Sequence, residues 1–336
     1  MAKRTRRGGV RTRSVAGIDD LAPELRFNVL LRATVQMQKK MLSEDLGIKG
    51  VAFGYKETAG ELTRQLCVRF YVRKKIVRPG AVRSIPRVLR VRVQHKGVRY
   101  AFAVPTDLIE APGIDRLETH AKRPKLAPSI FHSTNPNEYG TATALVADPS
   151  GTRYILSAAH VVACVLRAPP VVLDSLIDSD TKPGVGTLNA YPMVGSSGID
   201  AAVVRPALTS PETLVPRPGD VPVTVECPES ELFLQDPGGF TMYSFRRTRS
   251  MTLHAVHPNF TVKDVYAEGP VTLPLIFEFQ CGAEGGDSGS LVVDAHGRGV
   301  GMHIMGMKGE SQLGYSVPIR RVLNGVVPGT RFTLAH

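Results

Sequence analysis

The sequence predicts a mainly β protein, in which an all-β C-terminal domain follows a smaller α+β N-terminal domain. Beyond residue 135, short apolar runs alternate with clusters of Gly, Pro, Asn and Asp, a pattern typical of a β-barrel or sandwich. The first part of the chain instead combines one helical apolar stripe with strand-like alternation. Charge divides the chain in the same way: residues 1–126 hold 28 Lys and Arg against 11 Asp and Glu, whereas residues 127–336 hold 14 against 19.

The N-terminal part is predicted to contain one helix and several strands. Apolar residues at every fourth position indicate a helix that ends near Gly47: Leu25, Val29, Ala33, Met37 and Met41. We interpret this stripe as a packing face. Residues 51–72, with a turn at Ala59-Gly60, predict a β-hairpin, and further strands are expected at 87–93 and 98–104.

Composition also sets the expected domain boundaries. An Arg-rich start cannot bury enough apolar surface to offset the entropy of ordering it, so we expect a basic disordered tail at 1–20. The α+β domain is expected at 21–112, a linker rich in proline and charge at 113–127, and the β domain at 128–336.

Several classes of protein are excluded by composition. No apolar run approaches the about 18 residues of a membrane-spanning helix, and the basic start leads into polar residues rather than an apolar signal-peptide centre. We therefore predict a cytoplasmic protein without membrane association. The cysteines show no C-x-x-C spacing, so we expect free buried thiols, no metal, no cofactor and no disulfide framework; they are Cys67, Cys164, Cys227 and Cys281.

A glycine-rich turn in the β domain carries the first candidate catalytic residue. Residues 285–290 read GGDSGS and lead into the apolar run 291–293. A nucleophilic serine must project from a tight turn whose own backbone N–H groups face the developing oxyanion, and flanking side chains would obstruct it. Ser288 is therefore a candidate nucleophile. The segment alone would equally fit an ordinary glycine-rich β-turn.

Two further segments supply the partners that such a serine needs. His160 follows a strand-like run and two alanines, and Asp200 opens the apolar run 201–204. A carboxylate in that position can accept the imidazole Nδ1–H and fix its tautomer. Taken alone, the histidine would more often be a packed structural residue. The weaker carboxylate candidates lie in a polar, turn-like stretch and are Asp174, Asp178 and Asp180.

The order His160, Asp200, Ser288 and the motifs AAH, DAAVV and GDSGS resemble those of the chymotrypsin-like (trypsin-like) serine peptidases. The resemblance covers about residues 127–336. It implies two packed six-stranded antiparallel β-barrels with the triad between them, and a serine endopeptidase that acts on a protein or peptide substrate. It also implies an oxyanion hole formed by the backbone N–H groups of Gly286 and Ser288.

The N-terminal segments GVAFGYKETAG, ELTRQLCVRFYVRKK and VRYAFAVPTDLIEA are similar to a domain that precedes such proteases in bacterial proteins and in the plant narrow-leaf group. This similarity implies a fixed two-part architecture. It does not indicate what the first part binds.

The same family resemblance suggests which residues form the specificity pocket. Gly282 would lie at its base, where Lys- or Arg-selective members carry an acid, so trypsin-type cleavage is not expected. His303 falls where Glu-selective members carry a histidine, although a histidine packed in the strand 299–306 fits at least as well. Asp287 resembles the aspartate that binds a newly cut N-terminus. Either Asp287 has another partner, or the chain is cut near 122–125.

Functions of two other classes remain open at this stage. A catalytically silent protease-fold module could bind a peptide or partner, although such a module usually lacks a triad residue or a loop glycine. The basic N-terminal half could bind nucleic acid, yet no recognisable binding motif accompanies its charge. The favoured prediction is a regulated or latent serine endopeptidase, which could be self-inhibited or activated by a partner.

Overall fold

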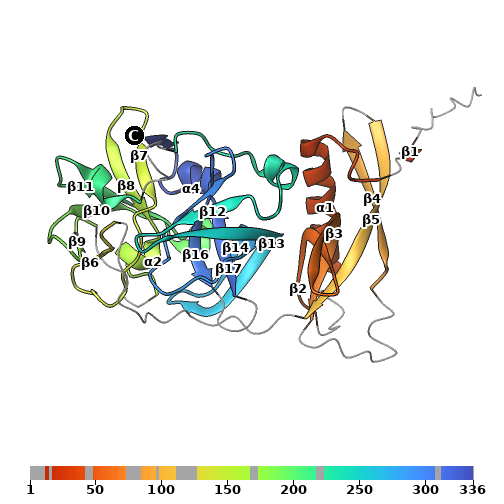
Figure 1. The fold of residues 1–336 in the computed structure, drawn as a ribbon, viewed down its shortest axis with the longest axis horizontal. Coiled ribbons are helices and arrows are strands. Elements are labelled where there is room, and N and C mark those ends of the chain that lie inside the picture. Colours follow the sequence, from red (N-terminus) through yellow and green to blue (C-terminus); the bar gives the residue numbers. More distant parts are fainter. Residues whose placement is uncertain are drawn as a thin grey trace, which may run out of the picture. The chain divides into compact units, whose positions relative to one another are not determined.

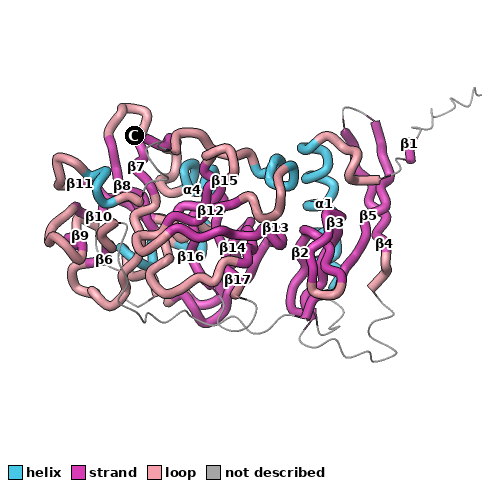
Figure 2. The backbone as a smooth tube through the Cα atoms, in the orientation of Figure 1, coloured by secondary structure: helices cyan, strands magenta, loops and turns pink. Residues whose placement is uncertain are grey.

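The fold is taken from a computed structural model that describes residues 12–14, 17–41, 48–72, 85–95, 98–110, 127–166, 173–216, 223–306 and 312–335. The chain divides into two compact units, Met1–Ala111 and Pro112–His336. Figure 1 labels their helices and strands, and Figure 2 shows that strands dominate both. The predicted linker 113–127 lies outside the described residues except for residue 127.

The N-terminal unit packs one helix on a small sheet. Its elements are α1 (Pro23–Met41), β2 (Ile48–Thr58), β3 (Glu61–Val72), β4 (Val88–His95) and β5 (Val98–Glu110). Strands β2 and β3 form an antiparallel hairpin, β3 runs parallel to β5, and β4 runs antiparallel to β5. The Phe27 ring meets the Phe53 ring edge-on at 5.3 Å, which joins helix to sheet. The predicted helix, hairpin and two later strands are confirmed.

The segment predicted to be a disordered tail, 1–20, is partly ordered. Strand β1 (Thr12–Ser14) pairs in parallel with β5, and Ile18 is buried. A sheet edge offers backbone N–H and C=O groups that pair with any extended segment, whatever its side chains. Apolar periodicity therefore could not reveal this strand. Residues 1–11 lie outside the described part of the chain.

The first barrel of the C-terminal unit has six antiparallel strands in the order β7-β8-β11-β10-β9-β6. A bridge between Ile130 and Gly140 brings β6 back to the segment that enters β7. The C-terminal strand β18 (Thr333–Ala335) adds to the outer edge of β7. The six strands are β6 (Ile130–His132), β7 (Ala144–Ala147), β8 (Arg153–Ser157), β9 (Leu176–Ser179), β10 (Gly186–Ala190) and β11 (Ala202–Pro206).

The second barrel is a closed ring, because β13 pairs with both β12 and β14 while the path β12-β15-β16-β17-β14 joins the other side. Its strands are β12 (Phe240–Tyr243), β13 (Thr248–Tyr266), β14 (Gly269–Gln280), β15 (Leu291–Asp294), β16 (Gly299–Gly306) and β17 (Leu313–Pro318). The short helices of this unit are α2 (Ala159–Val162), α3 (Val194–Ser197), α4 (Ile319–Gly325), and the 3-10 turns at Pro211–Leu214 and Glu229–Leu234.

One apolar core runs through both barrels and includes fully buried Leu156, Val203, Leu273 and Met302. The mainly β class and the chymotrypsin-like double barrel expected from the sequence are confirmed by this topology. In the described ranges, no helix is both long and apolar enough to cross a bilayer.

Candidate active site

The predicted aspartate and histidine form a buried, doubly bonded pair. Asp200 Oδ2 lies 2.6 Å from His160 Nδ1, and Asp200 Oδ1 accepts the backbone N–H of His160 at 3.0 Å. The side chains are 1% and 12% exposed, respectively. Nδ1 must carry the proton that faces the carboxylate, so Nε2 of a neutral imidazole is free to accept one.

The negative charge of Asp200 is maintained despite its burial. Burial alone would raise the pKa of this carboxyl, but the charge of His160, the two hydrogen bonds from His160 and one from Tyr266 together lower it. Asp200 is thus ionised at neutral pH and can stabilise an imidazolium on His160.

Local sequence explains how His160 reaches this partner. Strand β8 ends at Ser157, and the fully buried Ala158 and Ala159 lead directly into the single turn of α2. Because protein interiors are close-packed, small side chains suit these two fully buried positions. The turn leaves the His160 side chain 12% exposed.

The predicted nucleophile lies in two consecutive tight turns. Asp287 N–H donates to Glu284 O at 3.1 Å, and Ser290 N–H donates to Asp287 O at 2.9 Å. Among the described residues, the N–H groups of Gly286 and Ser288 have no hydrogen-bond acceptor. Both predicted oxyanion-hole donors are therefore available to a ligand.

The Ser288 hydroxyl donates to Ile304 O at 3.3 Å. It makes no hydrogen bond with His160 within the described residues. Such bonds are often long or absent before substrate binds. The loops that carry these two residues nevertheless lie close together, because the Ser288 backbone oxygen and a methyl of Val161, the neighbour of His160, would both lie 2.6 Å from a Cβ added at Gly140.

Thr141, in the first barrel, fixes the nucleophile turn from the opposite side. Its N–H donates to Ser288 O at 2.8 Å and its hydroxyl donates to Gly286 O at 3.1 Å. A Cβ on Gly289, whose φ is +88°, would collide with the Thr141 carbonyl. The glycine thus permits the close approach that these bonds require. With both carbonyls held by Thr141, the Ser288 N–H that lies between them has a fixed direction.

Asp287 has an internal partner, which is the first of the two alternatives that the sequence left open. Arg249 Nη2 lies 3.0 Å from Asp287 Oδ2, and the Glu284 N–H donates to the same oxygen at 2.8 Å. Burial raises the pKa of Asp287, and the Arg249 charge opposes that rise. Arg249 also donates to Gly282 O and lies 3.4 Å from the Glu284 carboxylate. One guanidinium therefore spans the segment that leads to the nucleophile.

The two predicted pocket residues lie close to this arginine. Gly282 N–H donates to Gln312 O at 3.1 Å, and its carbonyl is bound by Arg249. His303 lies on β16 and is 1% exposed, and neither ring nitrogen has a hydrogen-bond partner among the described residues. Burial, Arg249 and His160 lower the pKa of His303 to about 3, so its imidazole is neutral.

The weaker aspartates serve other loops. Asp178 lies on β9 rather than in a turn and accepts the Gly184 N–H at 2.7 Å, while Asp180 accepts the Ser129 N–H at 2.9 Å. Neither forms a hydrogen bond with His160 in the described structure. All four cysteines are buried thiols outside any disulfide, as expected from their spacing.

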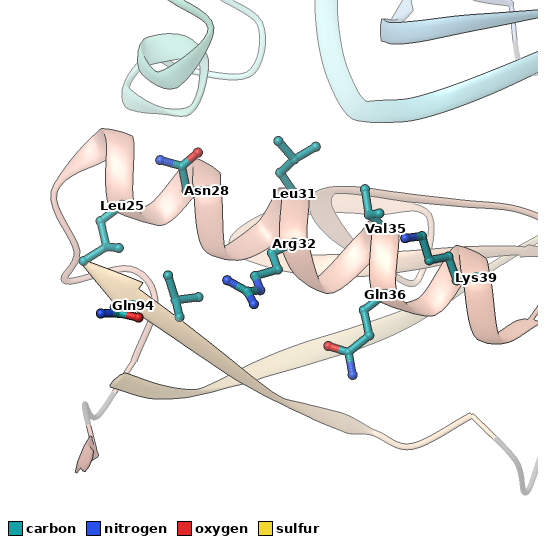
Figure 3. A pocket seen from close by; sticks show the side chains of 9 residues that line it. Leu25, Asn28, Leu31, Arg32, Val35, Gln36, Lys39 and Gln94 are labelled. Carbon is teal, nitrogen blue, oxygen red and sulfur yellow. The ribbon is translucent and has the colours of Figure 1, made fainter. Parts of the chain in front are cut away.

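Figure 3 shows a groove on the N-terminal unit, of about 700 Å³, along the outer face of α1. It is lined by apolar Leu31 and Val35 and by the cations Arg32 and Lys39. The predicted packing stripe faces the other way, since four of its five residues are buried and Leu25 alone lines the groove. The groove presents no nucleophile or carboxylate, and we assign it no chemistry.

Comparisons with known proteins were made by sequence and by structure. No family model and no curated protein sequence matches the chain. Solved structures of proteases do match. Nocardiopsis protease is 16% identical, with 63% of this chain and 99% of that one covered and a TM-score of 0.38. The active form of the Rv3671c protease from M. tuberculosis is 16% identical, with 64% and 88% covered and a TM-score of 0.39.

The MamO protease domain from Magnetospirillum magneticum is also 16% identical, with 59% of this chain and 94% of that one covered and a TM-score of 0.34. At this identity and these TM-scores the likeness assigns no function, which only the geometry of this chain's own site can support.

His160, Asp200 and Ser288 were proposed from the sequence, whereas three residues that contact Asp200 or the nucleophile turn were not: Thr141, Arg249 and Tyr266. None of the three lies in a recognisable motif. Each acts across a distance of more than 35 residues in the chain, and only the fold brings it to the site.

Proposed function

We propose that the chain is a serine endopeptidase in which Ser288 is the nucleophile, His160 the general base and Asp200 the residue that orients the histidine. The observation that carries the proposal is the buried, ionised Asp200 bound to both Nδ1 and the backbone N–H of His160. A purely structural histidine needs no such double attachment. The unpaired N–H groups of Gly286 and Ser288 supply the second requirement, a site for an oxyanion.

These groups suffice for acyl transfer. His160 Nε2 takes the proton of Ser288 Oγ as the oxygen attacks a peptide carbonyl, and the tetrahedral oxyanion forms between the two N–H groups. His160 then protonates the leaving amine, whose bond to the carbonyl carbon breaks. Water then attacks the acyl carbon while His160 Nε2 takes its proton. The bond between that carbon and Ser288 Oγ breaks, His160 returns the proton to Ser288, and the acid leaves.

The test is covalent labelling with a fluorophosphonate. We expect the parent chain to be labelled at Ser288, and Ser288→Ala and His160→Ala to lose the label, the latter by several orders of magnitude in rate because the residues act as a unit. Ser210→Ala, which removes an exposed serine outside the three segments that carry the candidate residues, is the matched control and should label normally. A parent chain that takes no label favours the silent binding module instead.

The pairing of Asp287 with Arg249 further supports activity without cleavage of the chain. In zymogens, a new N-terminal ammonium supplies the cation that orders this loop, whereas here a guanidinium is already in place. We therefore expect the labelled protein to have the intact mass of the full chain. A label found only on fragments cut near residues 122–125 would contradict this part of the proposal.

For substrate preference, we propose that Glu precedes the cleaved bond. A neutral His303 with two unpaired ring nitrogens can donate one hydrogen bond to a substrate carboxylate. Because His303 is 1% exposed, the side chains over its ring must move to admit the substrate. Equal kcat/KM for matched Glu and Leu peptides would exclude this preference.

A further inference from the structure

One hydrogen bond to the triad comes from the second barrel and from a residue outside every motif. Tyr266, the last residue of β13, donates its hydroxyl hydrogen to Asp200 Oδ2 at 2.8 Å. This is the same oxygen that faces His160 Nδ1 at 2.6 Å. Tyr266 is 5% exposed and Asp200 is 1% exposed, so water cannot replace the phenol without rearrangement.

The phenol can act only as a donor in this position. Burial and the neighbouring charge of Asp200 raise the pKa of Tyr266 well above its usual value. The phenol therefore keeps its proton at neutral pH. A carboxylate bound by two fixed donors on one oxygen and one on the other has little freedom to rotate about its Cβ–Cγ bond.

The backbone brings Tyr266 to this place through an irregular hairpin end. Pairing between β13 and β14 shifts register between Val262 and Tyr266, and such bulges re-aim the side chains that follow them. Tyr266 then pairs with Gly269 across a tight turn.

The remaining residues of that turn contact the same two loops. Ala267 N–H donates to Val165 O at 3.2 Å, just beyond the helix that carries His160. Glu268 accepts the N–H groups of Val194 at 3.2 Å and Gly195 at 2.7 Å, at the start of the helix that leads to Asp200. The hairpin tip, defined as residues 266–268, thus binds both the histidine loop and the aspartate loop.

We propose that Tyr266 is a positioning residue that fixes the Asp200 carboxylate, and through it the His160 imidazole, in the orientation needed for proton transfer. This inference rests on the proposed function for its kinetic consequence, but its structural content does not depend on hydrolysis. The hydrogen bonds of the hairpin tip support the proposal, since each of its three residues bonds to a segment that carries a member of the proposed triad.

The kinetic test is Tyr266→Phe, which removes one oxygen and keeps the ring. A hydrogen bond to a charged, buried group justifies an expected fall in kcat of about tenfold with KM unchanged. Tyr243→Phe on β12 is the matched control, because the Tyr243 hydroxyl has no hydrogen bond in the described structure, and it should leave both constants unchanged. Equal kcat in the two variants would overturn the proposal.

A spectroscopic test separates this inference from the proposed function. In the Ser288→Ala background, the His160 Nδ1–H proton resonance reports the bond to Asp200, whether or not the parent chain hydrolyses peptides. We expect Tyr266→Phe to shift it and Tyr243→Phe to leave it in place. If Tyr266→Phe does not fold, Glu268→Gln takes its place, because it weakens the bonds between the hairpin tip and the N–H groups of Val194 and Gly195. This variant must then shift the His160 Nδ1–H resonance. An unmoved resonance in the folded variant overturns the inference; a shifted resonance in a chain that never labels overturns only the function.

Discussion

Replacing Arg249 by Gln should destabilise the protein far more than replacing its neighbour Arg247. Both guanidiniums reach the Glu284 carboxylate, at 3.4 Å and 2.6 Å, but only Arg249 also pairs with Asp287. The Arg249 side chain is 8% exposed and Asp287 is fully buried, whereas Arg247 is 35% exposed. Arg249→Gln therefore leaves a buried carboxylate without its cation, and Arg247→Gln removes only a surface ion pair.

The magnitudes follow from that difference in burial. Removing one partner of a buried pair costs about 3–5 kcal/mol, because the other charge stays desolvated. A partly exposed pair contributes about 0–1 kcal/mol. Adding Asp287→Asn to Arg249→Gln should recover part of the loss, since no buried charge is then left unpaired. The cycle of the two single variants and the double variant isolates the pairwise energy.

The dependence on pH has a definite sign. Burial raises the pKa of Asp287, so as pH falls the folded protein takes up this proton before the unfolded chain does. Protonation removes the buried charge that Arg249 compensates. The excess cost of Arg249→Gln is therefore full at neutral pH and shrinks as pH falls through the raised pKa.

The assay is urea unfolding of the parent chain and each variant, followed by circular dichroism, at neutral and at mildly acidic pH. The slope of free energy against urea should stay constant between variants, so that midpoints report stability. Fluorophosphonate labelling of the folded variants tests the loop itself, and Arg249→Gln should label more slowly than Arg247→Gln. Equal unfolding free energies for Arg249→Gln and Arg247→Gln would refute the assignment of Arg249 as the cation that orders this segment.

Two further predictions concern the turn and the pocket. Gly289→Ala should abolish labelling, because its Cβ would collide with the Thr141 carbonyl. The control is Gly151→Ala, at an almost equal φ of +84° but in open space, which should cost only about 1–2 kcal/mol of stability and keep full labelling. Similar effects of both variants on labelling would show that the close approach to Thr141 is unimportant. His303 is neutral in the fold, with a pKa of about 3 against an ordinary value of 6.5. As pH falls from 6.5 to about 3, the unfolded chain takes up this proton and the folded protein does not, so His303 lowers stability by about 1.4 kcal/mol per pH unit over that range. His303→Gln should remove that slope from the acid unfolding profile, and an unchanged profile would argue against a buried neutral imidazole.

The amino-acid sequence by itself determined the class of fold and the three residues of the proposed triad. Strand periodicity located the N-terminal hairpin, and glycine-rich punctuation located the β domain, because alternation and turn chemistry are local properties of the chain. The triad could be proposed because each member lies in a short segment whose neighbours have a local role. Ala158 and Ala159 give the histidine turn room, and glycines surround Ser288.

Only the tertiary structure determined which groups hold those residues. Arg249 as the partner of Asp287, Thr141 as the clamp on the nucleophile turn and Tyr266 as the donor to Asp200 are all ordinary residues in their own segments. Strand β1 was missed for a related reason, since backbone pairing to the β5 edge leaves no side-chain pattern. Contacts between segments far apart in the chain depend on barrel closure and strand register, and a single sequence carries no local signal of either.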